Sequence, residues 1–204
     1  MKKNIAVLLT TFFSFSLYCQ KTLPNAKLKN ESKQILQSSK FLNDEKPILI
    51  ICSMKLNHSA FSRYVVRYLV AMKEMIKAKE SYQDLKSILI VSTQGRNNYI
   101  DKFLKHSLVT NDSLKDVFEF YFDNHLDFIK AGDYESTFPS AFLYDKKGKL
   151  IAYTKGVGEV MRYRPEPKSP YDSFRKGQTT EELYRKTKAI KYMSEKIDQV
   201  LEKK

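Results

Sequence analysis

The side chains best suited to redox, nucleophilic or metal chemistry are few in this chain of 204 residues. They are two cysteines and three histidines: Cys19, Cys52, His58, His106 and His125. Their spacing fits none of the patterns by which Cys and His hold zinc, and the sequence has no glycine-rich phosphate loop. The sequence therefore predicts no metal and no cofactor.

Two aspartates lie close to His125 in the sequence, and together the three could suggest a metal site. We expect Asp123 to end a strand, whereas His125 and Asp127 fall on a short helix. Side chains placed in this way do not converge on one ion, so we assign no metal to them.

Cys52 ends the run Ile48-Leu49-Ile50-Ile51-Cys52, whose continuous apolar character predicts a strand buried on both faces. A cysteine in such a strand behaves as a small, inert hydrophobic residue. The alternative is a reactive thiol at this position.

A turn over residues 53–58 separates this strand from an amphipathic helix over 61–76. At the junction, His58 offers a base and Ser59 a hydroxyl nucleophile. Adjacent turn residues rarely point at each other, and no acidic residue lies nearby in sequence to orient the imidazole. We therefore expect Ser59 to cap the helix and His58 to be solvated.

The elements predicted around these residues alternate between strand and helix. Strands are expected at 48–52, 88–91 and 117–122, helices at 61–76, 98–105 and 124–131, a hairpin at 141–144 and 150–153, and a last helix from 179. Such alternation implies parallel strands joined by right-handed crossovers, with the closing hairpin adding antiparallel strands. The expected fold class is α/β, with a central mixed sheet flanked by helices.

One segment carries a family resemblance. Residues 137–150 read Thr-Phe-Pro-Ser-Ala-Phe-Leu-Tyr-Asp-Lys-Lys-Gly-Lys-Leu. This segment resembles the region of periplasmic thiol–disulfide oxidoreductases of the thioredoxin-like superfamily in which a cis-proline precedes a strand, a charged turn with glycine and another strand. Pro139 matches that proline. The resemblance covers about residues 46–156 and the last helix, and it implies a thioredoxin-like fold with a peptide-binding loop at Phe138 and Pro139.

The resemblance also locates an active site whose Cys-x-x-Cys pair is missing, because Asn57-His58-Ser59-Ala60 stands in its place. Thiol–disulfide exchange needs one thiolate to attack and a second thiol to resolve the mixed disulfide. The expected function is therefore binding of a peptide or protein partner at this vestigial groove, without redox chemistry. One alternative is an oxidoreductase acting through Cys52, and a weaker alternative is binding of an anionic polymer through the basic surface.

Residues 1–19 have the features of a secretory signal peptide, with Lys2 and Lys3 before the apolar stretch 5–17. We expect cleavage after Cys19 and export to the periplasm or cell envelope, or secretion. Lipid attachment at Cys19 is the alternative, which the bulky Tyr18 before it disfavours. No later run of eighteen apolar residues exists, so we expect no membrane span in the mature chain.

The remaining chain divides into an N-terminal linker or helix over 20–45 and a domain over 46–204, with a loop insertion at about 157–178. Loss of Lys2 and Lys3 lowers the net charge from +13 to +11. The basic residues alternate with acidic ones, which favours solubility over binding of nucleic acid. The loop segment 162–171 mixes basic and aromatic side chains, but its prolines and acids are typical of an exposed connection.

Overall fold

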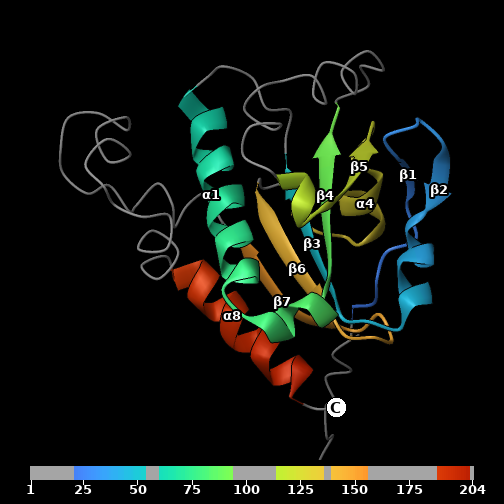
Figure 1. The fold of residues 1–204 in the computed structure, drawn as a ribbon. Coiled ribbons are helices and arrows are strands. Elements are labelled where there is room, and N and C mark those ends of the chain that lie inside the picture. The colour runs from blue at the N-terminus through green and yellow to red at the C-terminus, as the bar shows by residue number, and fades with distance from the viewer. Residues whose placement is uncertain (1–20, 54–59, 94–113, 136–138, 156–187, 203–204) are drawn as a thin grey trace, which may run out of the picture.

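The computed structural model of the protein describes residues 21–53, 60–93, 114–135, 139–155 and 188–202. Its centre is a seven-stranded sheet with the order β2-β1-β5-β4-β3-β6-β7 (Figure 1). Strands β3 (Ile48–Ser53), β4 (Lys86–Ser92) and β5 (Glu119–Asp123) run parallel to one another. Strand β6 (Ser140–Tyr144) pairs antiparallel with β3, and β7 (Leu150–Lys155) pairs antiparallel with β6. The mixed sheet expected from the sequence is therefore confirmed.

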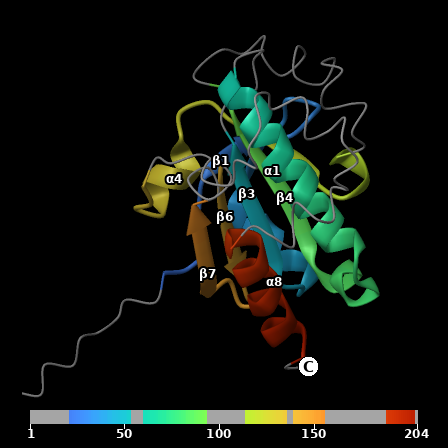
Figure 2. The same cartoon turned by 90° about the vertical axis from the view of Figure 1, so that its left-hand side faces the viewer.

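Helices cover both faces of the sheet, as the two views in Figures 1 and 2 show. The long helices α1 (Ala60–Lys77) and α8 (Lys188–Leu201) pack on one face, and the short helix α4 (Asp127–Ala131) packs on the other. Strand β3 alternates between them: Leu49 and Ile51 join the core under α1 and α8, whereas Ile50 and Cys52 join the core under α4. A strand buried on both faces explains why its sequence is apolar throughout.

Residues 20–45 differ from the expected linker or helix. They contain β1 (Lys27–Lys29), β2 (Ile35–Gln37) and the 3-10 helix η1 (Ser38–Asp44). Strand β1 extends the sheet by pairing with β5. Leu28 and Phe41 are each 1% exposed and give this segment its own share of the core. The period-two pattern that marks a strand covers only three residues here, which is too short to distinguish from a linker.

The boundaries of two other elements also differ. The third strand, expected at 117–122, occupies 119–123, because the N–H groups of Val117 and Phe118 bond back to the Leu114 carbonyl at 3.1 and 2.9 Å. The helix expected at 124–131 begins at Asp127, because Leu126 has a φ of 60° and interrupts the helical backbone.

Other expectations lie wholly or partly outside the described residues. These are the signal peptide, the helix at 98–105, the loop insertion at 157–178 and the start of the last helix. Within the part of the chain that is described, none of the helices combines the length and apolar content needed to cross a bilayer.

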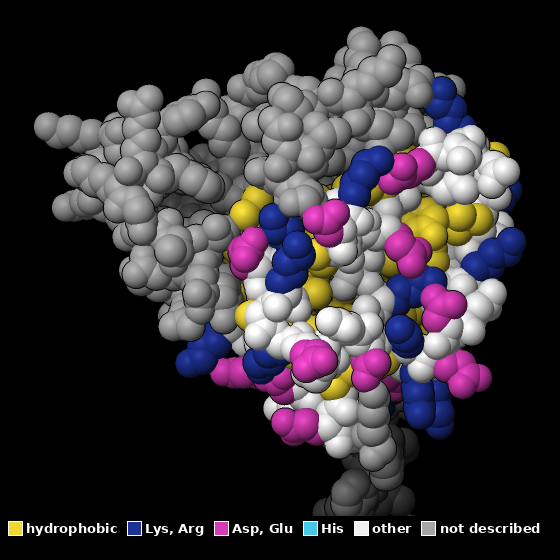
Figure 3. All heavy atoms as spheres, in the orientation of Figure 1, with side chains coloured by type: hydrophobic (Ala, Val, Ile, Leu, Met, Phe, Trp, Pro, Cys, Tyr) yellow, Lys and Arg dark blue, Asp and Glu magenta, His cyan; other side chains and the backbone are white. Residues whose placement is uncertain are grey.

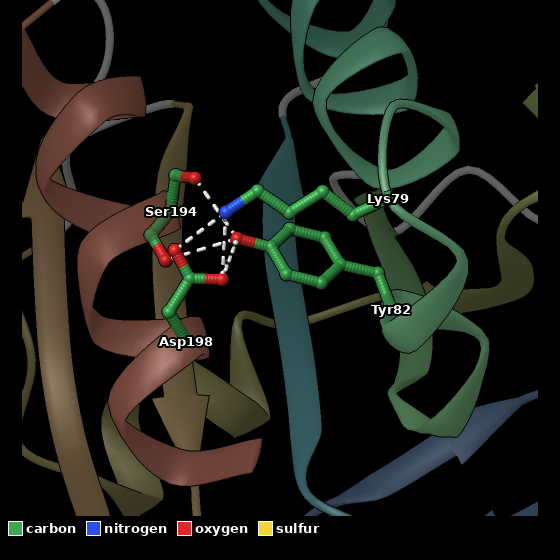
Figure 4. Close-up of polar contacts among 4 residues, drawn as sticks. All are labelled: Lys79, Tyr82, Ser194 and Asp198. Atoms are coloured by element: carbon green, nitrogen blue, oxygen red, sulfur yellow. Dashed lines mark hydrogen bonds and ion pairs between the residues drawn. The ribbon is translucent and has the colours of Figure 1, made fainter. Parts of the chain in front are cut away.

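Helix α8 is fixed to the rest of the domain by a polar cluster (Figure 4). Lys79 Nζ lies 2.8 and 2.6 Å from the two carboxylate oxygens of Asp198. The Tyr82 hydroxyl lies 2.9 Å from Asp198 Oδ1, 2.9 Å from Ser194 Oγ and 3.0 Å from the Ser194 carbonyl. The hydrogen bond to Asp198 raises the pKa of Lys79, and burial raises the pKa of Tyr82. The cluster ties α8 to η2 (Glu80–Asp84), the 3-10 helix that precedes β4.

Candidate functional site

Polar residues gather at one end of the sheet, where the parallel strands finish and β6 begins. Five of them are buried: Ser53, Ser92, Thr93, Asp123 and Ser140. They come from four different strands or strand ends, which the sheet places side by side. Ser92 stands opposite Asp123, and Ser140 stands opposite Cys52. In open α/β sheets this carboxyl end of the parallel strands is where ligand sites usually form.

Asp123 holds the backbone that follows β5. Its carboxylate accepts hydrogen bonds from the backbone N–H groups of His125, Asp127 and Phe128 at 3.1, 2.9 and 2.9 Å. These bonds cap α4 and hold Leu126 in its left-handed conformation, which costs a residue with a side chain about 1–3 kcal/mol. With three N–H donors in place, Asp123 stabilises the backbone of this corner.

Asp123 ends β5 and Asp127 begins α4, as expected, but His125 lies before the helix and not on it. Asp123 is buried at the end of β5, whereas the His125 side chain is exposed. No group of three His, Cys, Asp or Glu side chains able to hold a metal ion occurs among the described residues.

Cys52 is 2% exposed and lies between Ile90 of β4 and Ser140 of β6. Burial raises the pKa of its thiol well above the ordinary value, and the negative charge of Asp123 raises it further. Because the thiolate is the nucleophile in disulfide exchange, both effects oppose reactivity. The expectation that Cys52 is a buried strand residue is confirmed.

An aromatic layer covers the face of the sheet on which Cys52 lies. The Phe142 ring lies 4.5 Å from the Tyr134 ring and 4.9 Å from the Tyr153 ring, centroid to centroid. The Tyr134 and Tyr144 hydroxyls are 2.9 Å apart, and burial raises the pKa of both tyrosines. These aromatic side chains and Cys52 belong to one apolar cluster, which separates the thiol from water.

Pro139 is buried and directly precedes β6. Since the next residue, Ser140, pairs with Cys52, Pro139 lies beside the carboxyl end of β3. Helix α1 begins at Ala60, at the same end of the sheet (Figure 1). The sequence-predicted positions Asn57, His58, Ser59 and Phe138 lie outside the described residues, as does the Ala60 side chain.

Sequence reasoning missed the buried hydroxyls at this end. The Ser92 Oγ is enclosed and makes no hydrogen bond within the described structure. Thr93 donates its hydroxyl to Asn124 Oδ1 and its backbone N–H to the Asp123 carbonyl. The available signal was the change from apolar to polar residues at the end of each buried strand, at Ser92-Thr93 and at Asp123-Asn124.

No protein-family profile matches the sequence, and no curated protein matches it either. Solved structures do match. A putative thiol:disulfide interchange protein DsbE from Chlorobium tepidum aligns over 89% of this chain and 96% of its own, with a TM-score of 0.54 and 14% identity. ScoI from Arabidopsis thaliana, solved with copper bound, aligns over 87% and 99%, with a TM-score of 0.51 and 9% identity.

A hypothetical protein from Sinorhizobium meliloti aligns over 91% of this chain and 85% of its own, with a TM-score of 0.50 and 15% identity. At identities this low, structural similarity establishes the fold but does not establish the activity. The chain has a thioredoxin-like fold, with a central mixed sheet flanked by helices, as the resemblance at residues 137–150 implies.

Proposed function

We propose that this chain is an exported thioredoxin-fold protein that binds an extended peptide or protein partner without thiol–disulfide exchange. The partner would lie in a groove formed by the turn at Asn57–Ala60 and the loop at Phe138 and Pro139. The observation that carries this proposal is the pairing of Cys52 with Ser140, because it sets Pro139 beside the end of the strand that leads into the turn.

The chemistry of Cys52 supports a role in binding over a redox role. Dithiol exchange needs an accessible, low-pKa thiol and a second thiol to release the product. Cys52 is buried with a raised pKa, and the only other cysteine in the sequence, Cys19, lies in the predicted signal peptide. Binding of a backbone beside a proline loop requires neither sulfur.

The alternative is a thiol activity through Cys52. It gains some support from the fold, since the similar structures include a putative thiol:disulfide interchange protein and a copper-bound protein. The enclosure of the thiol by Ile90, Ser140 and the aromatic layer counts against it. Binding of an anionic polymer has little support, since Lys, Arg, Asp and Glu side chains are interspersed on the face shown in Figure 3.

A site-specific photo-crosslinker distinguishes these functions. With the crosslinker at Phe138, we expect one discrete adduct from the envelope fraction of the source cell, and loss of that adduct when unlabelled protein competes. The matched control carries the crosslinker at Tyr192, which is 40% exposed on α8. Equal adducts from both positions, or an adduct at Phe138 that disappears in Cys52→Ala, would contradict binding at the groove.

A further inference from the structure

The turn between β6 and β7 and the first described residues of the chain form a basic corner of the molecule. The turn, Asp145-Lys146-Lys147-Gly148-Lys149, follows Tyr144, which pairs with Ile48 at the start of β3. The turn therefore lies at the amino ends of the parallel strands, below the sheet in Figure 1. We call four residues the lysine corner: Lys21, Lys146, Lys147 and Lys149.

Two backbone hydrogen bonds hold the N-terminal residues against this turn. The Leu23 N–H donates to the Gly148 carbonyl at 2.7 Å, and the Leu150 N–H donates to the Lys21 carbonyl at 2.8 Å. An antiparallel bridge lies between these two bonds, so the first described residues run beside the start of β7 (Figure 2). The chain thus enters the folded domain at the turn that carries the other three lysines.

The Lys21 side chain strengthens this attachment. Its Nζ donates to the Asp133 carbonyl at 2.7 Å and to the Gly132 carbonyl at 3.3 Å, at the C-terminal end of α4. It also lies 4.7 Å from the centre of the Tyr134 ring. None of these three groups is charged, so Lys21 remains a positive charge of the lysine corner.

The ammonium groups of the other three lysines are unpaired in the described structure. Lys146 and Lys147 are exposed and Lys149 is half-buried, and none of these side chains forms a hydrogen bond or ion pair with a described residue. Asp145 uses its carboxylate to accept the backbone N–H groups of Lys147 and Lys149, each at 2.9 Å. Asp145 and Asp133 offset two of the four positive charges, so the lysine corner keeps a positive surplus.

The lysine corner also lies close to the predicted signal-peptide junction. Only Gln20 separates Lys21 from Cys19, where the signal peptide is expected to end. Two residues of extended chain span at most about 7 Å. The apolar stretch of a signal peptide holds this junction at the membrane until cleavage, and a lipid on Cys19 would do the same. We therefore expect the lysine corner to be the part of the folded domain nearest the lipid headgroups.

We propose that the lysine corner docks on the anionic headgroups of a phospholipid bilayer. The lipid phosphates accept hydrogen bonds from the unpaired ammonium groups, and the positive net charge of the chain attracts it to the surface. Charge alone suits an acidic polypeptide equally well, but the nearby junction favours a bilayer. In this orientation the candidate groove, at the other end of the sheet, faces away from the bilayer and stays open to a partner.

Co-sedimentation of the mature chain, residues 20–204, with phospholipid vesicles tests the proposal. We expect binding to vesicles that contain phosphatidylglycerol, no binding to pure phosphatidylcholine, and weaker binding as salt screens the charges. Each lysine near an anionic surface contributes about fivefold in affinity, so the triple variant Lys146→Gln, Lys147→Gln, Lys149→Gln should bind about 100-fold more weakly. Asp145 is retained in this variant, so the turn keeps its two backbone hydrogen bonds.

The matched control is the triple variant Lys27→Gln, Lys77→Gln, Lys191→Gln, which removes the same charge from exposed positions on β1, α1 and α8. It should weaken binding about threefold at most, through net charge alone. With spin-labelled lipid headgroups, the amide signals of residues 146–149 should broaden more than those of residues 122–123, at the far end of the sheet. Equal losses of affinity from the two triple variants, or stronger broadening at 122–123, would overturn the proposal. Equally tight binding of soluble polyglutamate that also needs the three turn lysines would instead indicate an acidic polypeptide and overturn docking on a bilayer.

Discussion

The two ends of the parallel strands both contain a buried serine, but the charged groups at the two ends have different partners. Strand β4 has a buried serine near each end, Ser87 and Ser92, and neither hydroxyl has a partner among the described residues. At the carboxyl end the charged group, Asp123, is saturated by three backbone N–H donors. Around the amino end of β4 the charged side chains form ion pairs, Lys86 with Asp44 and Lys77 with Asp116 at 3.7 Å. At the carboxyl end the buried charge thus supports the backbone, whereas around the amino end of β4 charged side chains pair with one another.

Cys52 reactivity is the property for which this comparison predicts the largest effect. Because burial and Asp123 both oppose the thiolate, native Cys52 should react with a thiol reagent about 1000-fold more slowly than in the unfolded chain. Stopped-flow labelling at pH 8 with and without denaturant measures the ratio. A native rate within about tenfold of the unfolded rate, a difference too small for a core position, would restore the thiol enzyme as the better explanation.

Loss of the Asp123 carboxylate should give the next largest effect. Asp123→Ala leaves three N–H donors without an acceptor and the left-handed Leu126 unsupported, so we expect a loss of about 3 kcal/mol in the free energy of unfolding. Urea denaturation measures this loss. Asp116→Ala, which removes an exposed pair at 3.7 Å, is the control and should change stability by less than about 0.5 kcal/mol. Equal effects would mean that Asp123 does not hold the corner.

The Lys79–Tyr82–Asp198 cluster predicts a smaller, pH-dependent effect near the amino end. The pKa values of Lys79 and Tyr82 are both raised on folding, so the folded state retains protons that the unfolded state releases above about pH 10. Stability is therefore fully present below that pH and falls as the pH rises through it.

Thermal melts between pH 8 and 11 should show this decline. The double variant Lys79→Gln, Tyr82→Phe should show a shallower decline and lose about 1–2 kcal/mol at pH 8, the usual worth of a partly buried hydrogen-bonded pair. An unchanged slope would exclude the cluster as its source.

The serines give the smallest predicted effect. Ser92→Ala removes a buried hydroxyl that has no partner in the described structure, so stability should stay constant or rise by up to about 1 kcal/mol. Ser38→Ala is the contrast, because the Ser38 Oγ accepts the Ala26 N–H at 2.8 Å and donates to the Pro24 carbonyl. That variant should lose about 1–2 kcal/mol. A comparable loss from Ser92→Ala would indicate that its hydroxyl is bonded.

Much of the fold can be predicted from the sequence, because the central strands are buried on both faces and read as apolar runs. The hairpin over residues 27–37 could not be predicted, since each of its strands is three residues long and Leu28 is the one fully buried residue in the two strands. The burial of Cys52 followed from its strand. The unpartnered hydroxyls and the cavity at the amino ends of the parallel strands could not be inferred, because they depend on which side chains from distant segments meet, as Lys46, Ser87 and Val117 do.

The most direct test of the central claim restores the missing chemistry at its expected place. The double variant Asn57→Cys, Ala60→Cys should reduce insulin disulfides with dithiothreitol, because the helix N-terminus favours a thiolate there. The wild-type protein should match Cys52→Ala at the background rate, since a lone thiol forms a mixed disulfide that no neighbour resolves. Wild-type turnover that Cys52→Ala abolishes, or a double variant no faster than wild type, would contradict a thioredoxin site that lacks only its cysteine pair.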